Sequence, residues 1–219
     1  MPIEIAGQQF TGFPGLDSVH LRNLNYRDRI RWFKYRFGRV FLTPFAEFRK
    51  LERPDCYIWL CVVNLVCSAI EALSRFQFEG SSDRDCFVQF VEKYFAPAFQ
   101  QPKLSLYDPR PEKGREASTS AEHLYKYFRS GLAHSFCIEW GGILHREDGA
   151  LNYIFAADTS PGAEKSLGVV PRELVDDFLS AINLFFRALE AASPSSPLQV
   201  QFTKRFDEVF LTKAGPSIP

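Results

Sequence analysis

The chain has 219 residues, of which 46% are hydrophobic and 15% aromatic, so it can bury a sizeable core and is not an intrinsically disordered protein. We expect one domain with appendages. The formal net charge is zero, which excludes a global field that draws the chain to nucleic acid; any such surface must be local.

Five cysteines occur without a CxxC pair or a histidine partner at zinc-finger spacing. We interpret them as buried small hydrophobes in a reducing compartment, and we predict no metal site and no cofactor. The first ten residues, MPIEIAGQQF, lack the basic and apolar regions of a signal peptide. The expected location is therefore the cytoplasm.

Residues 1–24 show little periodicity and are predicted to form an extended or partly docked arm. Residues 25–53 carry an apolar helical face, and Gly38 and Pro44 are expected to break it into two or three pieces. Between Arg22 and Arg53 there are ten basic and three acidic residues. This basic segment is a local positive region in a neutral chain.

The basic segment has two interpretations. Aromatic residues interleaved with positive charges suit phosphate neutralisation and base stacking. Alternatively, the segment is an amphipathic helix with a basic solvated face, compensated by acidic surface elsewhere. For the first interpretation, the candidate nucleic-acid contacts are Arg27, Arg31, Lys34 and Arg39, interleaved with Tyr26, Trp32 and Tyr35.

Residues 57–70 are the most apolar stretch, interrupted only by Asn64 and Ser68. Fourteen such residues are too few to span a bilayer and predict the central helix of a bundle, with no membrane partner. Near the end of this helix Glu71 is the only acid among apolar neighbours. It either orients Arg129 or His134, or reaches solvent or forms a structural ion pair.

A helix capped by Ser81 or Ser82 follows and ends before Pro97. Residues 100–117 then form a long irregular loop that is rich in proline and basic residues. Loops of this length are often functional or disordered. We include Lys113 and Arg115 of this loop among the candidate nucleic-acid contacts.

The stretch 118–140 is the one around which the candidate function is organised. Thr119 and Glu122 form a capping-box pattern, so a helix is predicted to start here. Arg129 and His134 flank its apolar face. The residues that form this face at helical spacing are Leu124, Tyr127, Phe128, Leu132 and Phe136.

Five positions on a regular α-helix correspond to about 140° of rotation and ~7.5 Å of rise, so Arg129 and His134 do not stack. They converge on one anion if Arg129 uses its long reach or if Gly131 lets the helix bend. They also converge if two copies of the chain compose the site across a two-fold axis. The last arrangement predicts a homodimer.

The two side chains have the chemistry that RNA cleavage requires. The 2′-hydroxyl of RNA is a nucleophile next to the scissile phosphate, so the reaction needs a base, an acid and a cation. Neutral histidine accepts a proton near pH 7, since its ordinary pKa is about 6.5. A guanidinium binds phosphate oxygens bidentately as negative charge develops. His134 and Arg129 suit these roles.

The motif Tyr-Phe-Arg-Ser-Gly-Leu-Ala-His at 127–134 resembles that of the HEPN family of all-α domains, in which Arg is followed after four to six residues by His on a late helix of a bundle. The resemblance implies metal-independent endoribonuclease activity that leaves 2′,3′-cyclic phosphate ends, with two motifs apposed in a dimer. Ser130 stands where family members often carry Asn, and Phe136 where the toxin branch often carries Tyr. The resulting candidate catalytic residues are Arg129, Ser130, His134 and Glu71.

Two other functions remain open at this stage. In the first alternative, the chain is a non-catalytic bundle of the same ancestry that binds a nucleotide, a nucleic acid or a protein partner. In the second alternative, the chain is an interaction protein in which the motif only holds helices together. An Arg and a His beside the apolar stripe of a helix are also common structural residues.

Residues 142–156 are predicted to form a short β-hairpin, with strands at 143–145 and 151–155. Pro171 is predicted to open a helix that closes the bundle, and a last helix is expected at 196–213. The predicted fold is an all-α, HEPN-like helical bundle with one hairpin insertion. Its segments are the arm 1–24, the basic segment 25–53, the bundle 54–192 and the helix 196–213.

Overall fold

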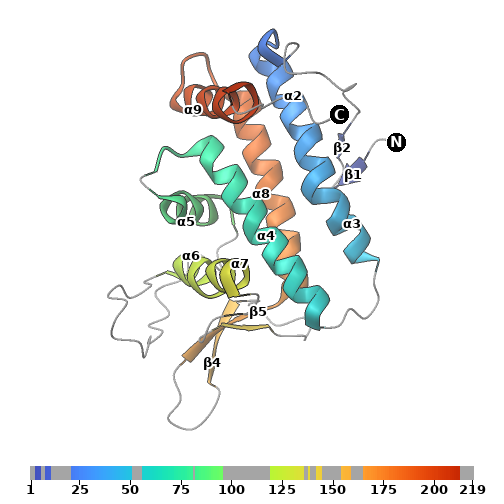
Figure 1. The fold of residues 1–219 in the computed structure, drawn as a ribbon, viewed down its shortest axis with the longest axis vertical. Coiled ribbons are helices and arrows are strands. Elements are labelled where there is room, and N and C mark those ends of the chain that lie inside the picture. Colours follow the sequence, from blue (N-terminus) through green and yellow to red (C-terminus); the bar gives the residue numbers. More distant parts are fainter. Residues whose placement is uncertain are drawn as a thin grey trace.

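A computed structural model gives the structure of the chain and describes residues 3–5, 8–10, 21–50, 56–80, 82–95, 119–135, 138, 142–144, 154–158 and 165–212. Within these ranges six continuous helical segments pack together, as expected for an all-α bundle (Figure 1). They are α2 (Tyr26–Phe37) with η1 (Gly38–Leu42) and α3 (Thr43–Arg49), α4 (Cys56–Gln77), α5 (Asp83–Tyr94), α6 (Ser120–His123) with η4 (Leu124–Ser130) and α7 (Gly131–Ser135), α8 (Pro171–Ala191), and α9 (Pro197–Phe206) with η5 (Asp207–Thr212).

Side-chain caps fix where several helices begin. The side-chain oxygens of Asn25, Ser82 and Ser196 each accept the backbone N–H three residues on. Thr119 accepts the N–H of Glu122 at 3.2 Å, so the predicted start of the motif helix is confirmed. Each cap satisfies one backbone donor that the first turn leaves without a helical partner.

The helix α4 is the central element of the bundle. It packs against α5, α8 and α9, and Figure 1 shows it crossing the middle of the molecule between α5 and the α2–α3 segment. Val62, Val66 and Ile70 on its inner face are fully buried. The central apolar helix predicted from residues 57–70 is therefore confirmed, although it extends to Gln77.

The longer extent of α4 changes the comparison with a membrane span. Ile58–Gln77 is long and apolar enough to cross a bilayer by length and composition, with a mean hydropathy of 1.5. The core helix of a soluble protein meets the same criteria, and α4 packs against three other helices. Only 44% of the apolar window is buried inside the bundle, so part of α4 presents apolar side chains outward.

Residues 26–49 of the basic segment form one continuous run of helix rather than two or three separate pieces. Gly38 begins the π-helical turn η1, and the N–H of Thr43 donates to the carbonyl of Gly38 five residues back. Pro44 lies in the first turn of α3, where a missing N–H is tolerated. Gly38 therefore begins a widened turn and Pro44 is accommodated in a first turn, and neither ends the helix.

The predicted hairpin is wrong in its pairing. The strands β3 (Gly142–Leu144) and β4 (Ile154–Asp158) exist, but each pairs with β5 (Lys165–Val169) in the order β3-β5-β4. The β3 pairing is parallel and the β4 pairing antiparallel. Because Val169 and Val170 are buried where β5 leads into α8, β5 is the strand anchored to the bundle and pairs with both others.

The remaining elements lie at the two ends of the chain. Two short antiparallel strands, β1 (Ile3–Ile5) and β2 (Gln8–Phe10), fall within the predicted N-terminal arm. At the other end α9 packs back on the bundle through Phe202 and Phe206, which are fully buried. The side-chain amide of Gln201 donates to the carbonyls of Arg75 and Phe78 at the end of α4, so α9 also caps that helix.

Candidate functional site

The motif helix buries the apolar face that its sequence predicted. Leu124, Tyr127, Phe128 and Leu132 are between 0% and 3% exposed. Phe136 lies outside the described residues. Burial of this face leaves Arg129, in η4, at the edge of the core with 20% of its side chain exposed.

Arg129 forms an ion pair with Glu71 of α4. Its Nε and Nη2 atoms donate to the same carboxylate oxygen, Oε2, at 2.6 and 2.5 Å. Both side chains are 20% exposed, so the pair is screened less than a surface pair and is strengthened by charge. The arrangement fits both an orienting role for Glu71 and a structural ion pair.

The helix carrying Arg129 and His134 is not a regular α-helix. Residues 124–130 are π-helical and α-helical geometry resumes at Gly131. The 140° offset between the two residues applies to an α-helix throughout and therefore does not describe this segment. His134 is within α7, but its side chain lies outside the described part of the structure. Ser130 is half-buried at the end of η4.

Two titratable side chains lie near the Arg129–Glu71 pair. Burial raises the pKa of the Cys67 thiol to about 12, against a smaller lowering by the Arg129 charge. Burial also raises the pKa of Tyr125, whose ring packs edge-on against Phe87 at 5.2 Å. Both groups are therefore neutral near pH 7, and Cys67 is not available as a thiolate nucleophile.

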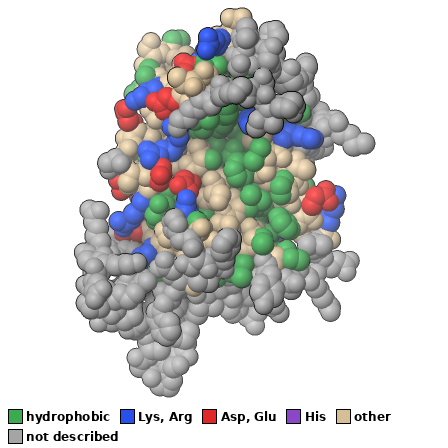
Figure 2. Space-filling view, in the orientation of Figure 1, with side chains coloured by type: hydrophobic (Ala, Val, Ile, Leu, Met, Phe, Trp, Pro, Cys, Tyr) green, Lys and Arg blue, Asp and Glu red, His purple; other side chains and the backbone are tan. Residues whose placement is uncertain are grey.

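The surface around the pair alternates in charge. Arg75 of α4 binds Asp83 of α5 at 2.5 Å. Arg84 of α5 binds Glu122 of α6 at 2.7 Å. Figure 2 shows positive and negative side chains interleaved along the side of the molecule where α5 lies in Figure 1. An RNA backbone at this surface would meet paired charges rather than a basic patch.

The structure divides the candidate contacts of the basic segment. Arg27, Arg31 and Arg39 are exposed, although Arg31 lies 3.4 Å from Asp28. Lys34 is half-buried, 3.5 Å from Glu190 of α8, and its ammonium lies over the Phe186 ring. Lys113 and Arg115 lie outside the described residues.

Two of the three aromatic residues named as interleaved with the basic residues, Trp32 and Tyr26, pack against the core. Trp32 is 8% exposed and packs edge-on against Phe206 and Phe210. Tyr26 packs against Phe202, and its hydroxyl donates to the carbonyl of Leu189. These two rings contribute to the core, and the expectation that they stack on bases is therefore wrong for them.

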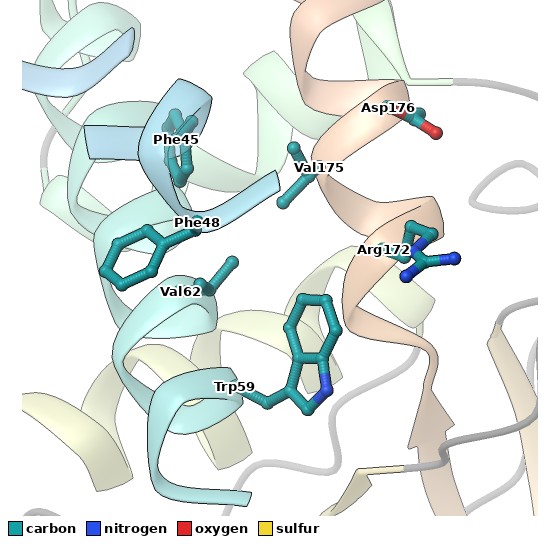
Figure 3. A pocket seen from close by; sticks show the side chains of 7 residues that line it. All are labelled: Phe45, Phe48, Trp59, Val62, Arg172, Val175 and Asp176. Carbon is teal, nitrogen blue, oxygen red and sulfur yellow. The ribbon is translucent and has the colours of Figure 1, made fainter. Parts of the chain in front are cut away.

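A cavity of about 270 Å³ between α3, α4 and α8 was missed by sequence reasoning (Figure 3). Trp59, Arg172 and Asp176 are among its lining residues. The available signal was weak: a tryptophan near the start of a mostly apolar helix, and an Arg and an Asp one turn apart at the start of another. Sequence spacing cannot bring these helices together.

Within the part of the chain that the structure describes, no group of three or more His, Cys, Asp or Glu side chains is placed to hold a metal ion. No protein-family model, curated protein or solved structure matches the chain. The resemblance to the HEPN family therefore depends on the sequence motif at 127–134 alone.

Proposed function

We propose that this chain is a metal-independent endoribonuclease of the HEPN type. The observation that carries the proposal is the Arg129–Glu71 pair, in which the central helix holds the motif arginine at the edge of the core. His134 follows five residues later in the same helical segment. The wide π-helical turns at Arg129 add support, because such turns occur frequently at functional sites.

In the proposed reaction His134 accepts the proton of the 2′-hydroxyl, and the 2′-oxygen attacks the adjacent phosphorus. The P–O5′ bond breaks, and the leaving 5′-oxygen takes a proton from a second acid, so the products are a 2′,3′-cyclic phosphate and a 5′-hydroxyl. Arg129 binds the phosphate oxygens as their charge grows. Among the described residues its contacts with Glu71 involve Nε and Nη2, and the Nη1 donors are proposed to reach a phosphate oxygen.

Glu71 is proposed to act on the reaction through Arg129. A guanidinium fixed by a carboxylate loses less conformational freedom when it binds a phosphate, because its plane is already set. The exposed Arg27, Arg31 and Arg39 of the α2–η1 segment are proposed to add non-specific contacts to the RNA backbone. The expected partner is therefore single-stranded RNA.

We further propose that two copies of the chain form a homodimer through the outer face of α4. Ile58 and Leu65 are half-buried and Cys61 is exposed, and their spacing places them on one side of the helix. Figure 2 shows hydrophobic side chains gathered where α4 lies in Figure 1. The same helix continues to Glu71, so a symmetric dimer formed here is proposed to relate two Arg129–Glu71 pairs by its two-fold axis.

Leu65→Arg is expected to convert the dimer to a monomer, because it places a charge in an apolar interface. Light scattering at micromolar concentration measures the mass. Val200→Arg is the matched control, since Val200 is 56% exposed on α9, away from this face, and should leave the dimer intact. A monomeric wild type that retains activity contradicts the dimer.

A non-catalytic binding module is the second candidate. The observation that favours it is that Arg129 and the neighbouring arginines Arg75 and Arg84 all pair with carboxylates, as in a structural network. In that case the motif ties α4 to η4, and the exposed arginines of the α2–η1 segment alone contact a nucleic acid, a nucleotide or a protein.

Purified protein is expected to cleave single-stranded RNA in the presence of EDTA, because the proposed groups need no metal ion. Analysis of the product ends by mass spectrometry should show 2′,3′-cyclic phosphates. Restoration of activity only by added divalent cations contradicts the proposed roles. RNA binding without cleavage across a broad substrate panel favours the binding module.

A further inference from the structure

The cavity between α3, α4 and α8 has an apolar wall and a charged rim. Phe45 and Phe48 of α3, Trp59 and Val62 of α4, and Val175 of α8 form the wall. Arg172 and Asp176, one turn apart on α8, form the rim (Figure 3). Phe45, Val62 and Val175 are buried, so the wall is part of the core, whereas Arg172 and Asp176 are exposed.

The size of the cavity limits its occupant. Its volume of about 270 Å³ lies just below the roughly 300–1,000 Å³ typical of sites for drug-sized molecules. A single aromatic ring or a branched aliphatic group with a short polar end fits this volume. A nucleoside polyphosphate or an RNA strand does not, so the cavity is separate from the proposed RNA site.

The charges at the rim limit the occupant further. A guanidinium presents paired donors that match a carboxylate. Arg172 and Asp176 both line the cavity, and Figure 3 shows the Asp176 carboxylate directed away from the aromatic side chains. The nearby negative charge of Asp176 disfavours a ligand with two or more negative charges. Arg172 and Asp176 each also take part in an interaction within the protein, so a ligand carboxylate would share the charge of Arg172 with an existing partner.

We propose that this cavity binds a small organic monocarboxylate with an apolar, preferably aromatic, body. The apolar body lies against Phe48, Trp59 and Val175, and the carboxylate meets Arg172. The site does not depend on nuclease activity: Val62 precedes Glu71 by nine residues, which is about 13 Å along α4. Loss of either function therefore leaves the other measurable.

The probe is 3-phenylpropionate, compared with the uncharged 3-phenylpropanamide and the cationic 3-phenylpropylamine. Titration is followed by tryptophan fluorescence at the red edge of the indole band, where a phenyl group does not absorb. We expect saturable binding of the carboxylate in the low millimolar range or tighter, as its small size dictates. The carboxylate should bind about fivefold more tightly than the amide, since Arg172 is exposed and its charge is partly screened.

Three variants locate the site. Arg172→Gln should abolish the preference for the carboxylate, while Arg187→Gln, an exposed arginine farther along the same helix, should leave it unchanged. Val175→Phe fills the cavity and should weaken the carboxylate and the amide alike at least about tenfold. Trp59→Phe should remove the fluorescence change while calorimetry still detects binding. A thermal melt shows that each variant is folded.

Several results would overturn the proposal. They are no saturable binding of the carboxylate, equal or tighter binding of the amide or the amine, and affinities that neither folded Arg172→Gln nor folded Val175→Phe changes. If Val175→Phe does not fold, the comparison of Arg172→Gln with Arg187→Gln decides the matter by itself.

Discussion

Replacing His134 with alanine is expected to abolish RNA cleavage, and replacing Arg129 with alanine is expected to lower the rate at least about 100-fold. Removal of His134 deletes the general base. Removal of Arg129 deletes a positive charge that stabilises the phosphate more strongly in the transition state than in the ground state. Single-turnover cleavage of a defined RNA measures both effects, and RNA binding measured in parallel separates lost chemistry from lost affinity.

The Arg129 variant needs a structural control, because alanine leaves Glu71 as an unpaired carboxylate that is only 20% exposed. We expect a loss of about 1–3 kcal/mol in stability, between the values for surface and fully buried pairs. Arg84→Ala breaks a similar pair with Glu122, whose side chains are 27% and 21% exposed. It should lose similar stability and keep its activity.

The double variant Glu71→Gln/Arg129→Ala removes the uncompensated charge. It should recover part of the stability without recovering activity. If His134→Ala and Arg129→Ala both stay folded and cleave RNA at the wild-type rate, the motif is not catalytic. If Arg84→Ala loses activity as completely as Arg129→Ala, the loss reflects disturbance of the whole charged surface.

The helical elements were predictable because their signals are local. The Thr119 cap, the apolar run of α4 and the spacing of Leu124, Tyr127 and Phe128 each depend on residues close together in the chain. The same local logic placed Glu71 on the central helix as a possible partner of Arg129. The ion pair between Glu71 and Arg129 could not be predicted, because the sequence does not show which face of α4 packs against η4.

The predictions that were wrong concern which of several segments, far apart in the sequence, a strand or a side chain contacts. The segment Lys165–Val169 was not among the predicted strands, yet the burial of Val169 gives β5 the fixed position on which β3 and β4 pair. Trp32 and Tyr26 read as stacking residues because basic residues surround them in sequence, but their rings contact phenylalanines of α9 and η5.

The cavity and the π-helical turns share this dependence on packing. A π-helical turn contains more residues than an α-helical turn, and contacts with the neighbouring helices must stabilise this geometry. No residue pattern in 124–130 predicts it. The cavity exists because α3, α4 and α8 do not close fully over Trp59 and Val62. Neither feature is encoded within a single segment.

Phe33→Ala is expected to destabilise the protein by about 3–5 kcal/mol, the usual range for removing a buried phenylalanine. Phe33, on α2, is 5% exposed. Its ring lies 4.2 Å from that of Phe76 on α4, 6.0 Å from Phe186 on α8 and 5.7 Å from Phe202 on α9, measured between centroids. The cavity left by alanine therefore opens among four helices at once and has little scope to collapse.

Urea unfolding followed by far-ultraviolet circular dichroism measures this effect. Phe41→Ala is the control: Phe41 is half-buried, its ring packs on Phe37, and its loss should cost markedly less. A single transition that moves to lower urea for Phe33→Ala means that α2, α4, α8 and α9 unfold as one cooperative unit. A loss below about 1 kcal/mol, or a separate early transition, would mean instead that the basic helix is docked on the bundle without being part of its core.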